Sequence, residues 1–259
     1  IYPMYDVIVI GGGIAGLISS ILLVRNGLSV VLLEKNSYPF HRVCGEYISN
    51  EVKPFLVHND LYPYDIKPSY INKFKLTSIN GKSASLGLDM GGFGISRHSF
   101  DHFLFRKAKE AGVNALEKHK VDDIQHGENH FAVKVGQKDF ASKIVIGSFG
   151  KRSNLDRNRN FIQNRSPYLG VKYHIKTQMD KNEIALHNFQ NGYCGISEVE
   201  DEKFNLCYLS HRDNLKTNKN IAEMEQQVLH ENPFLKNIWA NSDFLFEEAL
   251  VINEISFEK

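Results

Sequence analysis

The chain has 259 residues, enough for one large domain or two ordinary ones. Hydrophobic residues make up 42% and charged residues 24%, which excludes a disordered, collagen-like or coiled-coil chain. The 31 Lys and Arg residues nearly balance the 30 Asp and Glu residues, so no overall charge selects a nucleic acid or an anionic membrane. We therefore expect a charged partner to bind only at a local patch.

Cysteine content and hydropathy indicate the cellular compartment that we expect for the protein. Three cysteines are too few for a disulfide framework or a paired-cysteine zinc site, and they favour a reducing, cytoplasmic setting. The uncharged run over residues 7–24 is long enough to span a membrane, but glycines at 11–13 interrupt it. We expect a strand, a turn and a helix there, with no transmembrane segment and no secretory signal.

The first third of the chain predicts a βαβ unit. Residues 5–10 are mostly β-branched and apolar, which is typical of a strand buried on both faces of a parallel sheet. Apolar residues at helical spacing then predict a helix over 14–26, with Gly27 at its end. A second buried strand is expected over 29–33.

A proline-containing stretch over 36–69 separates this unit from a predicted hairpin. Strands over 71–79 and 82–88 flank Asn80-Gly81, a pair that favours a two-residue type I′ loop. The pattern then predicts a helix over 97–111 and four short strands, over 114–117, 121–125, 131–135 and 143–146.

The second half predicts a different architecture after a polar, basic segment over 151–167. Alternation of apolar and polar residues indicates an antiparallel sheet with strands near 169–175, 184–186 and 204–208. Helices over 221–229 and 233–239 and a last strand over 245–257 follow. We therefore divide the chain into residues 4–165, whose segment 71–96 joins the second sheet, and residues 166–259.

The strongest chemical signal is a glycine motif between the first strand and helix. Gly11 permits a tight turn, Gly13 lets the backbone approach a pyrophosphate, and Gly16 lets the helix pack closely on the strand. Glu34 ends the second strand, where its carboxylate can accept hydrogen bonds from a ribose. The pattern predicts dinucleotide binding, and the alternative is a purely structural turn. The predicted binding residues are Gly11, Gly13, Ile14, Ala15, Gly16, Glu34 and Lys35.

Three further segments carry a resemblance to a known family. Residues 41–49, His-Arg-Val-Cys-Gly-Glu-Tyr-Ile-Ser, resemble the Cys-Gly-Glu loop of geranylgeranyl reductase-like flavoproteins, within the p-hydroxybenzoate hydroxylase-like group. Residues 94–97 with Asp101 and Leu104, and residues 146–153, are similar to the same group. The resemblance implies an α/β fold with a Rossmann-type FAD-binding domain and an antiparallel substrate sheet. It also implies FAD as cofactor and NAD(P)H as external electron donor.

The resemblance assigns further residues to the cofactor. An arginine at the position of Arg97 contacts the flavin cofactor in the family, and the second glycine-rich segment lies near the dinucleotide. The implied additions to the site are Arg42, Cys44, Gly45, Arg97, Val121, Gly147 and Gly150. The hydroxylases carry an Asp-Gly pair where this chain has Ser148-Phe149-Gly150, which favours the reductase-like branch.

Two residues are candidates for catalysis, each with a structural alternative. Cys44 either lines the flavin pocket and protonates a reduced substrate or packs as a small apolar residue. Tyr193 lies between Gly192 and Gly195, where it either faces the substrate or belongs to the core. The alternative for Arg42 is a surface charge on a loop, and the alternative for Arg97 is a helical pair with Asp101. We expect no metal site.

The function that the resemblance favours is FAD-dependent reduction of a carbon-carbon double bond in an apolar substrate. The alternatives are an FAD-dependent monooxygenase and a truncated flavin-binding protein without turnover. The second alternative arises because the family usually has a further segment that contacts FAD after the sheet, and none is seen after residue 254. A basic tract either receives a diphosphate- or carrier-linked substrate or is a solvated loop, and it comprises Lys151, Arg152, Arg157, Arg159 and Arg165. We expect no nucleic-acid partner and leave room for peripheral membrane contact.

Overall fold

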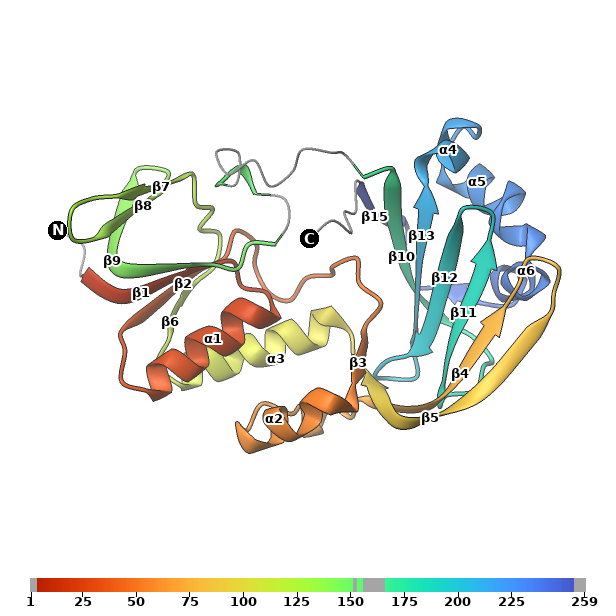
Figure 1. Ribbon diagram of the computed structural model, residues 1–259, viewed down its shortest axis with the longest axis horizontal. Coiled ribbons are helices and arrows are strands. Elements are labelled where there is room, and N and C mark those ends of the chain that lie inside the picture. The colour runs from red at the N-terminus through yellow and green to blue at the C-terminus, as the bar shows by residue number, and fades with distance from the viewer. Residues whose placement is uncertain (1–3, 151–152, 156–165, 254–259) are drawn as a thin grey trace. The chain divides into compact units, whose positions relative to one another are not determined.

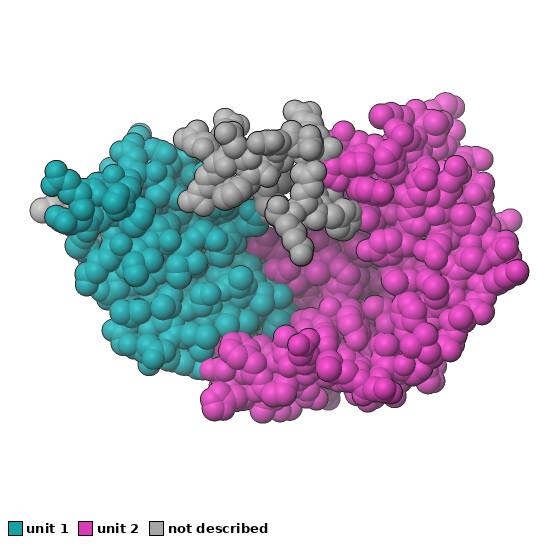
Figure 2. Space-filling model, viewed as in Figure 1, with its two compact units in different colours: residues 1–40, 98–163 teal, residues 41–97, 164–259 magenta. Residues whose placement is uncertain are grey.

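The computed structural model describes residues 4–150, 153–155 and 166–253. It contains two compact units, which Figure 2 shows in different colours. Unit 1 comprises residues 1–40 and 98–163, and unit 2 comprises residues 41–97 and 164–259. Segment 41–70 belongs to unit 2 and not to unit 1, because β3 (Tyr47–Ser49) pairs with β5 (Ser83–Gly94).

Unit 1 contains the predicted βαβ unit. Strand β1 (Met4–Ile10), helix α1 (Ile14–Arg25) and strand β2 (Val30–Leu33) follow one another, and β1 lies parallel to β2. The six-stranded sheet has the order β6-β2-β1-β9-β8-β7. Its other strands are β6 (Asn114–Leu116), β7 (Asp123–His126), β8 (Phe131–Val135) and β9 (Lys138–Gly147). The predicted Rossmann-type α/β class is confirmed.

Alternation along β1 explains how this sheet is covered. Ile8 and Ile10 pack in one apolar cluster with Val31, Leu33 and Val133. The intervening Val7 and Val9 point to the other face and are also buried, and α1 packs against β1 and β2. Both faces are therefore covered, as the run of apolar residues predicts. Helix α3 (Arg97–Glu110) matches its predicted position.

Unit 2 is built on a nine-stranded sheet with the order β14-β10-β13-β12-β11-β4-β5-β3, and β15 pairs with β10. The strands after β5 are β10 (Tyr168–Lys176), β11 (Glu183–Phe189), β12 (Gly192–Glu198), β13 (Phe204–His211), β14 (Asp243–Phe244) and β15 (Leu250–Asn253). Most pairs are antiparallel, but β4 (Ser69–Thr77) runs parallel to β11. The sheet is therefore mixed rather than purely antiparallel as predicted.

Helices α4 (Arg212–Lys216), α5 (Ile221–Gln227) and α6 (Pro233–Ala240) lie on one face of this sheet (Figure 1). Leu235 and Ile238 of α6 join Val171, Leu206 and Tyr208 of the strands in one apolar cluster. Asn232 caps α6 by accepting a hydrogen bond from the Phe234 N–H at 2.9 Å. Further short helical segments among the described residues are η1 (Asn50–Val52), α2 (Lys53–His58), η2 (Tyr64–Ile66) and η4 (Leu229–Glu231).

Two predicted details of unit 2 are wrong. The loop between β4 and β5 is not a two-residue type I′ turn, because only Gly81, with φ +79°, has a positive φ. Instead the Gly81 N–H donates to the Ser78 carbonyl, and the Ser78 N–H donates to the Lys82 carbonyl, as in a three-residue loop with a bulge. The single last strand predicted over 245–257 is replaced by the short strands β14 and β15, and residues 254–257 lie outside the described part.

No helix within the described residues is long and apolar enough to cross a membrane.

Candidate functional site

The glycine turn after β1 is packed as closely as its backbone allows. Gly11 has φ +102°, and its N–H donates to the Leu33 carbonyl at 2.9 Å. A Cβ at Gly11 would lie 2.6 Å from the Ser148 carbonyl oxygen, and one at Gly16 would lie 2.5 Å from the Ser148 Oγ. Both positions therefore require glycine, which brings the turn, α1 and the end of β9 together.

The amino terminus of α1 presents backbone donors without a competing acidic side chain. Gly13 is the N-cap, with extended φ and ψ and no side-chain cap among the described residues, and the first turn holds no acidic residue. The first intrahelical bond runs from the Leu17 N–H to the Gly13 carbonyl at 2.9 Å. The N–H groups of Ile14, Ala15 and Gly16 precede it and carry the partial positive charge of the helix terminus.

Glu34 connects the second strand to this turn. It is only 3% exposed, and its Oε2 accepts the Gly12 N–H at 2.7 Å. Its Oε1 accepts the backbone and side-chain N–H groups of Asn36, both at 2.9 Å. The carboxylate therefore holds the turn in place, and its predicted contact with a ribose stays a prediction.

Two residues of this site were missed by the sequence analysis. The Tyr38 hydroxyl donates to the Gly12 carbonyl, and its ring stacks on Phe105 with centroids 4.3 Å apart. The Ser148 Oγ lies 2.9 Å from the Ile10 carbonyl oxygen and 2.7 Å from that of Gly11. Ser148 belongs to a segment already singled out, but no pattern marks Tyr38.

The other predicted residues of unit 1 have varied environments. Lys35 is exposed, and Val121 is 9% exposed and packs with its side chain in the apolar cluster of the sheet. Gly147 ends β9, and both Gly147 and Gly150 are exposed. The basic residues Lys151, Arg152, Arg157, Arg159 and Arg165 lie outside the described residues.

In unit 2 the Cys-Gly-Glu loop is centred on the buried carboxylate of Glu46. This side chain has no exposed surface and accepts hydrogen bonds from Lys172 Nζ and, at 2.8 Å, from His174 Nε2. The Arg97 N–H donates to it at 2.7 Å. Burial disfavours the charged form, but the hydrogen bond from His174 and the charge of Lys172 outweigh it and lower the pKa of Glu46.

The same cluster binds the backbone of the loop. Lys172 Nζ donates to the Arg42 carbonyl at 3.1 Å. Asn205 Nδ2 donates to the carbonyl oxygens of Cys44 at 3.1 Å and Gly45 at 2.9 Å. The predicted site residues Arg42, Cys44 and Gly45 are thus held by side chains that bind their carbonyl groups. Arg97 is held to the same cluster by its N–H, which binds Glu46.

Glu46, Lys172 and His174 were not among the predicted site residues, although a signal existed. Val171 and Ile175 of β10 face the apolar cluster under the helices. Lys172 and His174 alternate with them and must therefore share the opposite face of the sheet. A lysine and a histidine at such spacing in a buried strand require a partner, and Glu46 was available in the loop motif.

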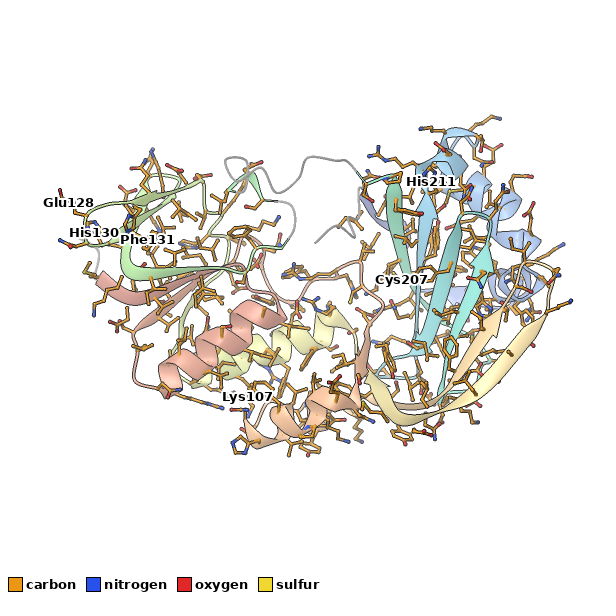
Figure 3. All side chains as sticks on the ribbon, viewed as in Figure 1. Lys107, Glu128, His130, Phe131, Cys207 and His211 are labelled. Carbon is orange, nitrogen blue, oxygen red and sulfur yellow. The ribbon has the colours of Figure 1, made fainter. Side chains whose placement is uncertain are left out.

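The two predicted catalytic residues are both partly accessible. Cys44 is half-buried, and Cys207 of β13 is its neighbour, labelled in Figure 3. Burial, with a smaller contribution from the Cys44 thiol, raises the pKa of Cys207 to about 12. The Tyr193 ring is 42% exposed on β12, whereas the adjacent Cys194 is fully buried in the core. Tyr193 is thus no core residue, and its contact with substrate stays a prediction.

No group of His, Cys, Asp and Glu side chains that could hold a metal ion occurs in the described part of the chain.

Comparisons with known proteins agree with the described geometry. A family model for NAD(P)-binding Rossmann-like domains matches residues 9–77. The chain is 30% identical to a flavin-dependent halogenase of Armillaria mellea over 141 residues, 49% of this chain and 26% of that protein. It is 27% identical to the digeranylgeranylglycerophospholipid reductase of Methanococcus vannielii over 192 residues, 70% of this chain and 43% of that protein. The chain therefore spans less than half the length of either relative.

A solved structure extends the likeness to both units. The myxobacterial chondrochloren halogenase, described as an FAD-dependent halogenase, matches with a TM-score of 0.79 at 17% sequence identity. The match covers 97% of this chain and 64% of that one. The fold is therefore similar to that of an FAD-dependent halogenase, and the relatives in sequence include a flavin-dependent halogenase and a reductase. The narrower reductase-like branch stays a prediction.

Proposed function

We propose that this chain binds FAD and serves the flavin-dependent oxidoreduction of an apolar organic substrate. The observation that carries the proposal is the α1 terminus, where three backbone N–H groups follow a glycine turn that Glu34 fixes through the Gly12 N–H. Such a terminus favours an anionic pyrophosphate. FAD supplies the electron transfer when it is bound, so the chain has to supply binding, orientation and a proton.

Each unit has its own set of proposed binding residues. In unit 1 the N–H groups of Ile14, Ala15 and Gly16 bind the pyrophosphate and Glu34 binds the ribose, beside Lys35, Val121, Gly147 and Gly150. In unit 2 the proposed contacts are Arg42, Cys44, Gly45 and Arg97. The Glu46 cluster acts on these through their backbone, because its members hold the carbonyl groups of the loop and the Arg97 N–H.

For the reaction, we favour reduction of a carbon-carbon double bond with NAD(P)H as the electron donor. The similarity to a reductase over 70% of the chain supports this choice. The partly accessible Cys44 Sγ, or a water molecule, supplies the proton, and the exposed Tyr193 ring contacts the substrate. The substrate is apolar and is either free or linked to a carrier or diphosphate.

A second candidate is an oxygen-dependent reaction, either halogenation or hydroxylation. The similarity to halogenases in sequence and in fold favours it. Oxygen consumption that is stoichiometric with a halogenated or hydroxylated product would support this candidate and contradict the reductase. Anaerobic NAD(P)H oxidation coupled to double-bond reduction would give the opposite answer.

FAD binding at α1 is tested by adding a charge to its first turn. Ala15 is exposed there, so Ala15→Glu adds a carboxylate without removing a packed side chain. Two negative charges about 5 Å apart repel by roughly 3 kcal/mol at an effective dielectric constant of about 20, an upper limit that corresponds to a 150-fold loss of affinity. We expect at least a tenfold weaker Kd for FAD, measured by quenching of flavin fluorescence.

Ala15→Gln is the matched control, because it has nearly the same size and no charge. We expect it to change the Kd for FAD less than threefold. A glutamate in the first turn stabilises a helix, so Ala15→Glu should not lower the thermal stability of the protein. Equal affinities of the two variants for FAD would show that the pyrophosphate does not bind at this terminus.

A further inference from the structure

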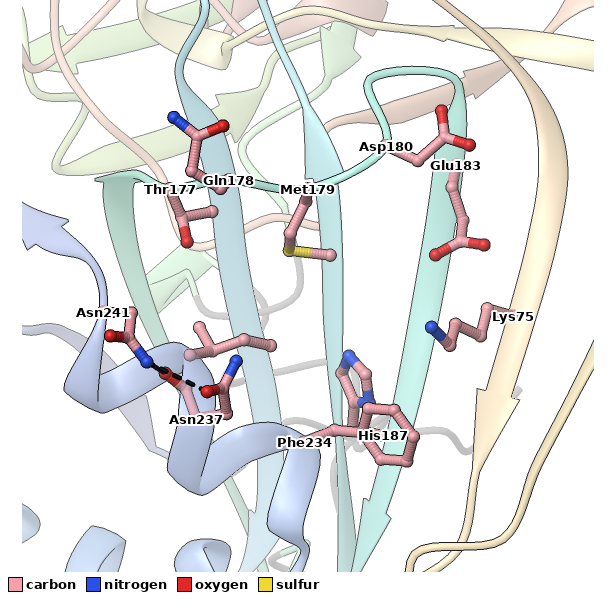
Figure 4. A pocket seen from close by; sticks show the side chains of 11 residues that line it. Lys75, Thr177, Gln178, Met179, Asp180, Glu183, His187, Phe234, Asn237 and Asn241 are labelled. Atoms are coloured by element: carbon pink, nitrogen blue, oxygen red, sulfur yellow. Dashed lines mark hydrogen bonds between the residues drawn. The ribbon is translucent and has the colours of Figure 1, made fainter.

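Unit 2 contains a cavity of about 710 Å³ on the face of its sheet that carries α6 (Figure 4). Strands β4 and β11, the segment between β10 and β11, and α6 form its walls. His187 of β11 lies opposite Cys194, which belongs to the apolar cluster under the helices. The cavity is therefore on the opposite face of the sheet from Glu46, Lys172 and His174.

His187 provides a fixed hydrogen-bond donor on the wall of this cavity. Its Nδ1 lies 2.8 Å from Thr77 Oγ1, which also accepts the Asn232 amide N–H at 2.8 Å. Thr77 is 1% exposed, and among the described residues His187 Nδ1 is the only acceptor for its hydroxyl proton. The proton of the neutral imidazole is therefore on Nε2, since each ring has one donor and one acceptor nitrogen.

This donor has no hydrogen-bond partner within the described part of the chain, although the His187 side chain is only 2% exposed. Burial, and to a smaller extent the charge of Lys75, lowers the pKa of His187 to about 4. The imidazole is therefore neutral at pH 7. A buried donor without a partner disfavours the empty cavity, and a ligand acceptor would remove this penalty.

A cation and an apolar wall lie beside this donor. Lys75 Nζ is 5.0 Å from the centroid of the Phe234 ring, and that ring stacks on His187 with centroids 5.9 Å apart. Met179 and Ile238 add further apolar surface, as Figure 4 shows for Met179. The lining of the cavity therefore combines an aromatic ring, a cation and an unpartnered donor.

The carboxylates of Asp180 and Glu183 also line the cavity, and they affect which ligand charge it can bind. Asp180 already pairs with Lys73 at 2.7 Å. Burial raises the pKa of Glu183, and Lys75 opposes this shift. Because Glu183 competes for Lys75, a bound anion must share this cation with it.

We propose that this cavity binds a small aromatic carboxylate, with its carboxylate between Lys75 and His187 and its ring against Phe234. The site uses none of the residues proposed for FAD, so the two proposals stand or fall separately.

Benzoate is the probe, titrated against the 259-residue chain and followed by NMR of the histidine ring nitrogens. We expect saturable shifts of one Nε2–H signal, assigned as His187 by its loss in His187→Gln. Benzamide has the same shape without the charge and should bind at least tenfold more weakly. Equal affinities for benzoate and benzamide, or no saturable shift, would overturn the proposal.

Substitutions at Lys75 and Glu183 separate the contributions of these two charges to benzoate binding. Neither substitution removes a fully buried side chain. Lys75→Met should weaken benzoate binding at least tenfold, whereas Lys82→Met, at an exposed position of the neighbouring loop, should leave it unchanged. Glu183→Gln should tighten benzoate binding, because it removes the competing carboxylate. A weaker affinity in Glu183→Gln would contradict an anionic ligand. The Kd for FAD, measured in parallel, should be the same in all these variants.

Discussion

The most demanding prediction concerns the carboxylate of Glu46. Its side chain is fully buried and accepts hydrogen bonds from Lys172, His174 and the Arg97 N–H. Glu46→Gln keeps the size of the side chain but leaves the Lys172 ammonium, which has no exposed surface, without a counter-charge. Breaking a buried ion pair in this way destabilises proteins by about 3–5 kcal/mol.

The assay follows unit 2 alone. Trp239 is the single tryptophan of the chain and lies in α6, so its fluorescence reports the unfolding of this unit in urea. With an m-value of about 2 kcal/mol/M, the expected loss lowers the urea midpoint by about 1.5–2.5 M at pH 7. Glu202→Gln is the control, because Glu202 forms an exposed pair with Lys181 and should leave the midpoint unchanged.

The pH dependence gives this prediction a second readout. The pKa of Glu46 in the folded protein is below its ordinary value of 4.5, so its contribution to stability is complete above pH 4.5. It is lost as the pH falls through the folded pKa, and the difference between wild type and Glu46→Gln should narrow there. The double variant Glu46→Gln, Lys172→Met should recover part of the stability. Equal urea midpoints for Glu46→Gln and Glu202→Gln would refute the reasoning.

Two further predictions concern other buried groups of unit 2. Glu225 accepts hydrogen bonds from the hydroxyls of Tyr173 at 3.0 Å and Tyr208 at 2.8 Å, while burial raises its pKa. Stability should therefore fall as the pH rises from 4.5 towards that raised value, and urea titrations of Glu225→Gln should lack this slope. The pKa of Cys207 is about 12, so iodoacetamide at pH 7.5 should modify Cys44 before Cys207, as judged by peptide mass spectrometry. Faster modification of Cys207 would contradict that environment.

The sequence predicted the parts of the fold that depend on local spacing. Gly11, Gly16 and the apolar strands beside them specify the βαβ unit, because the backbone there tolerates little else. Gly81 shows the limit of such reasoning. An Asn-Gly pair is compatible with several loops, and pairing of Thr77 with Ser83 sets the observed one.

The Glu46 cluster shows a second limit. Lys172 and Glu46 are 126 positions apart in the chain, and the alternation along β10 shows only that Lys172 must find some partner. Which partner it finds depends on how the loop over 41–46 meets the sheet, and that is a property of the tertiary structure. For the same reason the sequence analysis predicted Cys44 and Arg97 as site residues but not Glu46, whose carboxylate binds the Arg97 N–H and Lys172.

The parallel pairing of β4 with β11 has a consequence for synthesis of the chain. Thr77 of β4 and His187 of β11 are 110 positions apart and share a hydrogen bond, and Lys73 of β4 pairs with Asp180, 107 positions further on in the segment before β11. At about 5–20 residues per second, the ribosome needs roughly 5–20 s to make the intervening segment. Until β11 is made, the β4 edge of the β4–β5 hairpin lacks its partner strand, and an unpaired edge can pair with other strands.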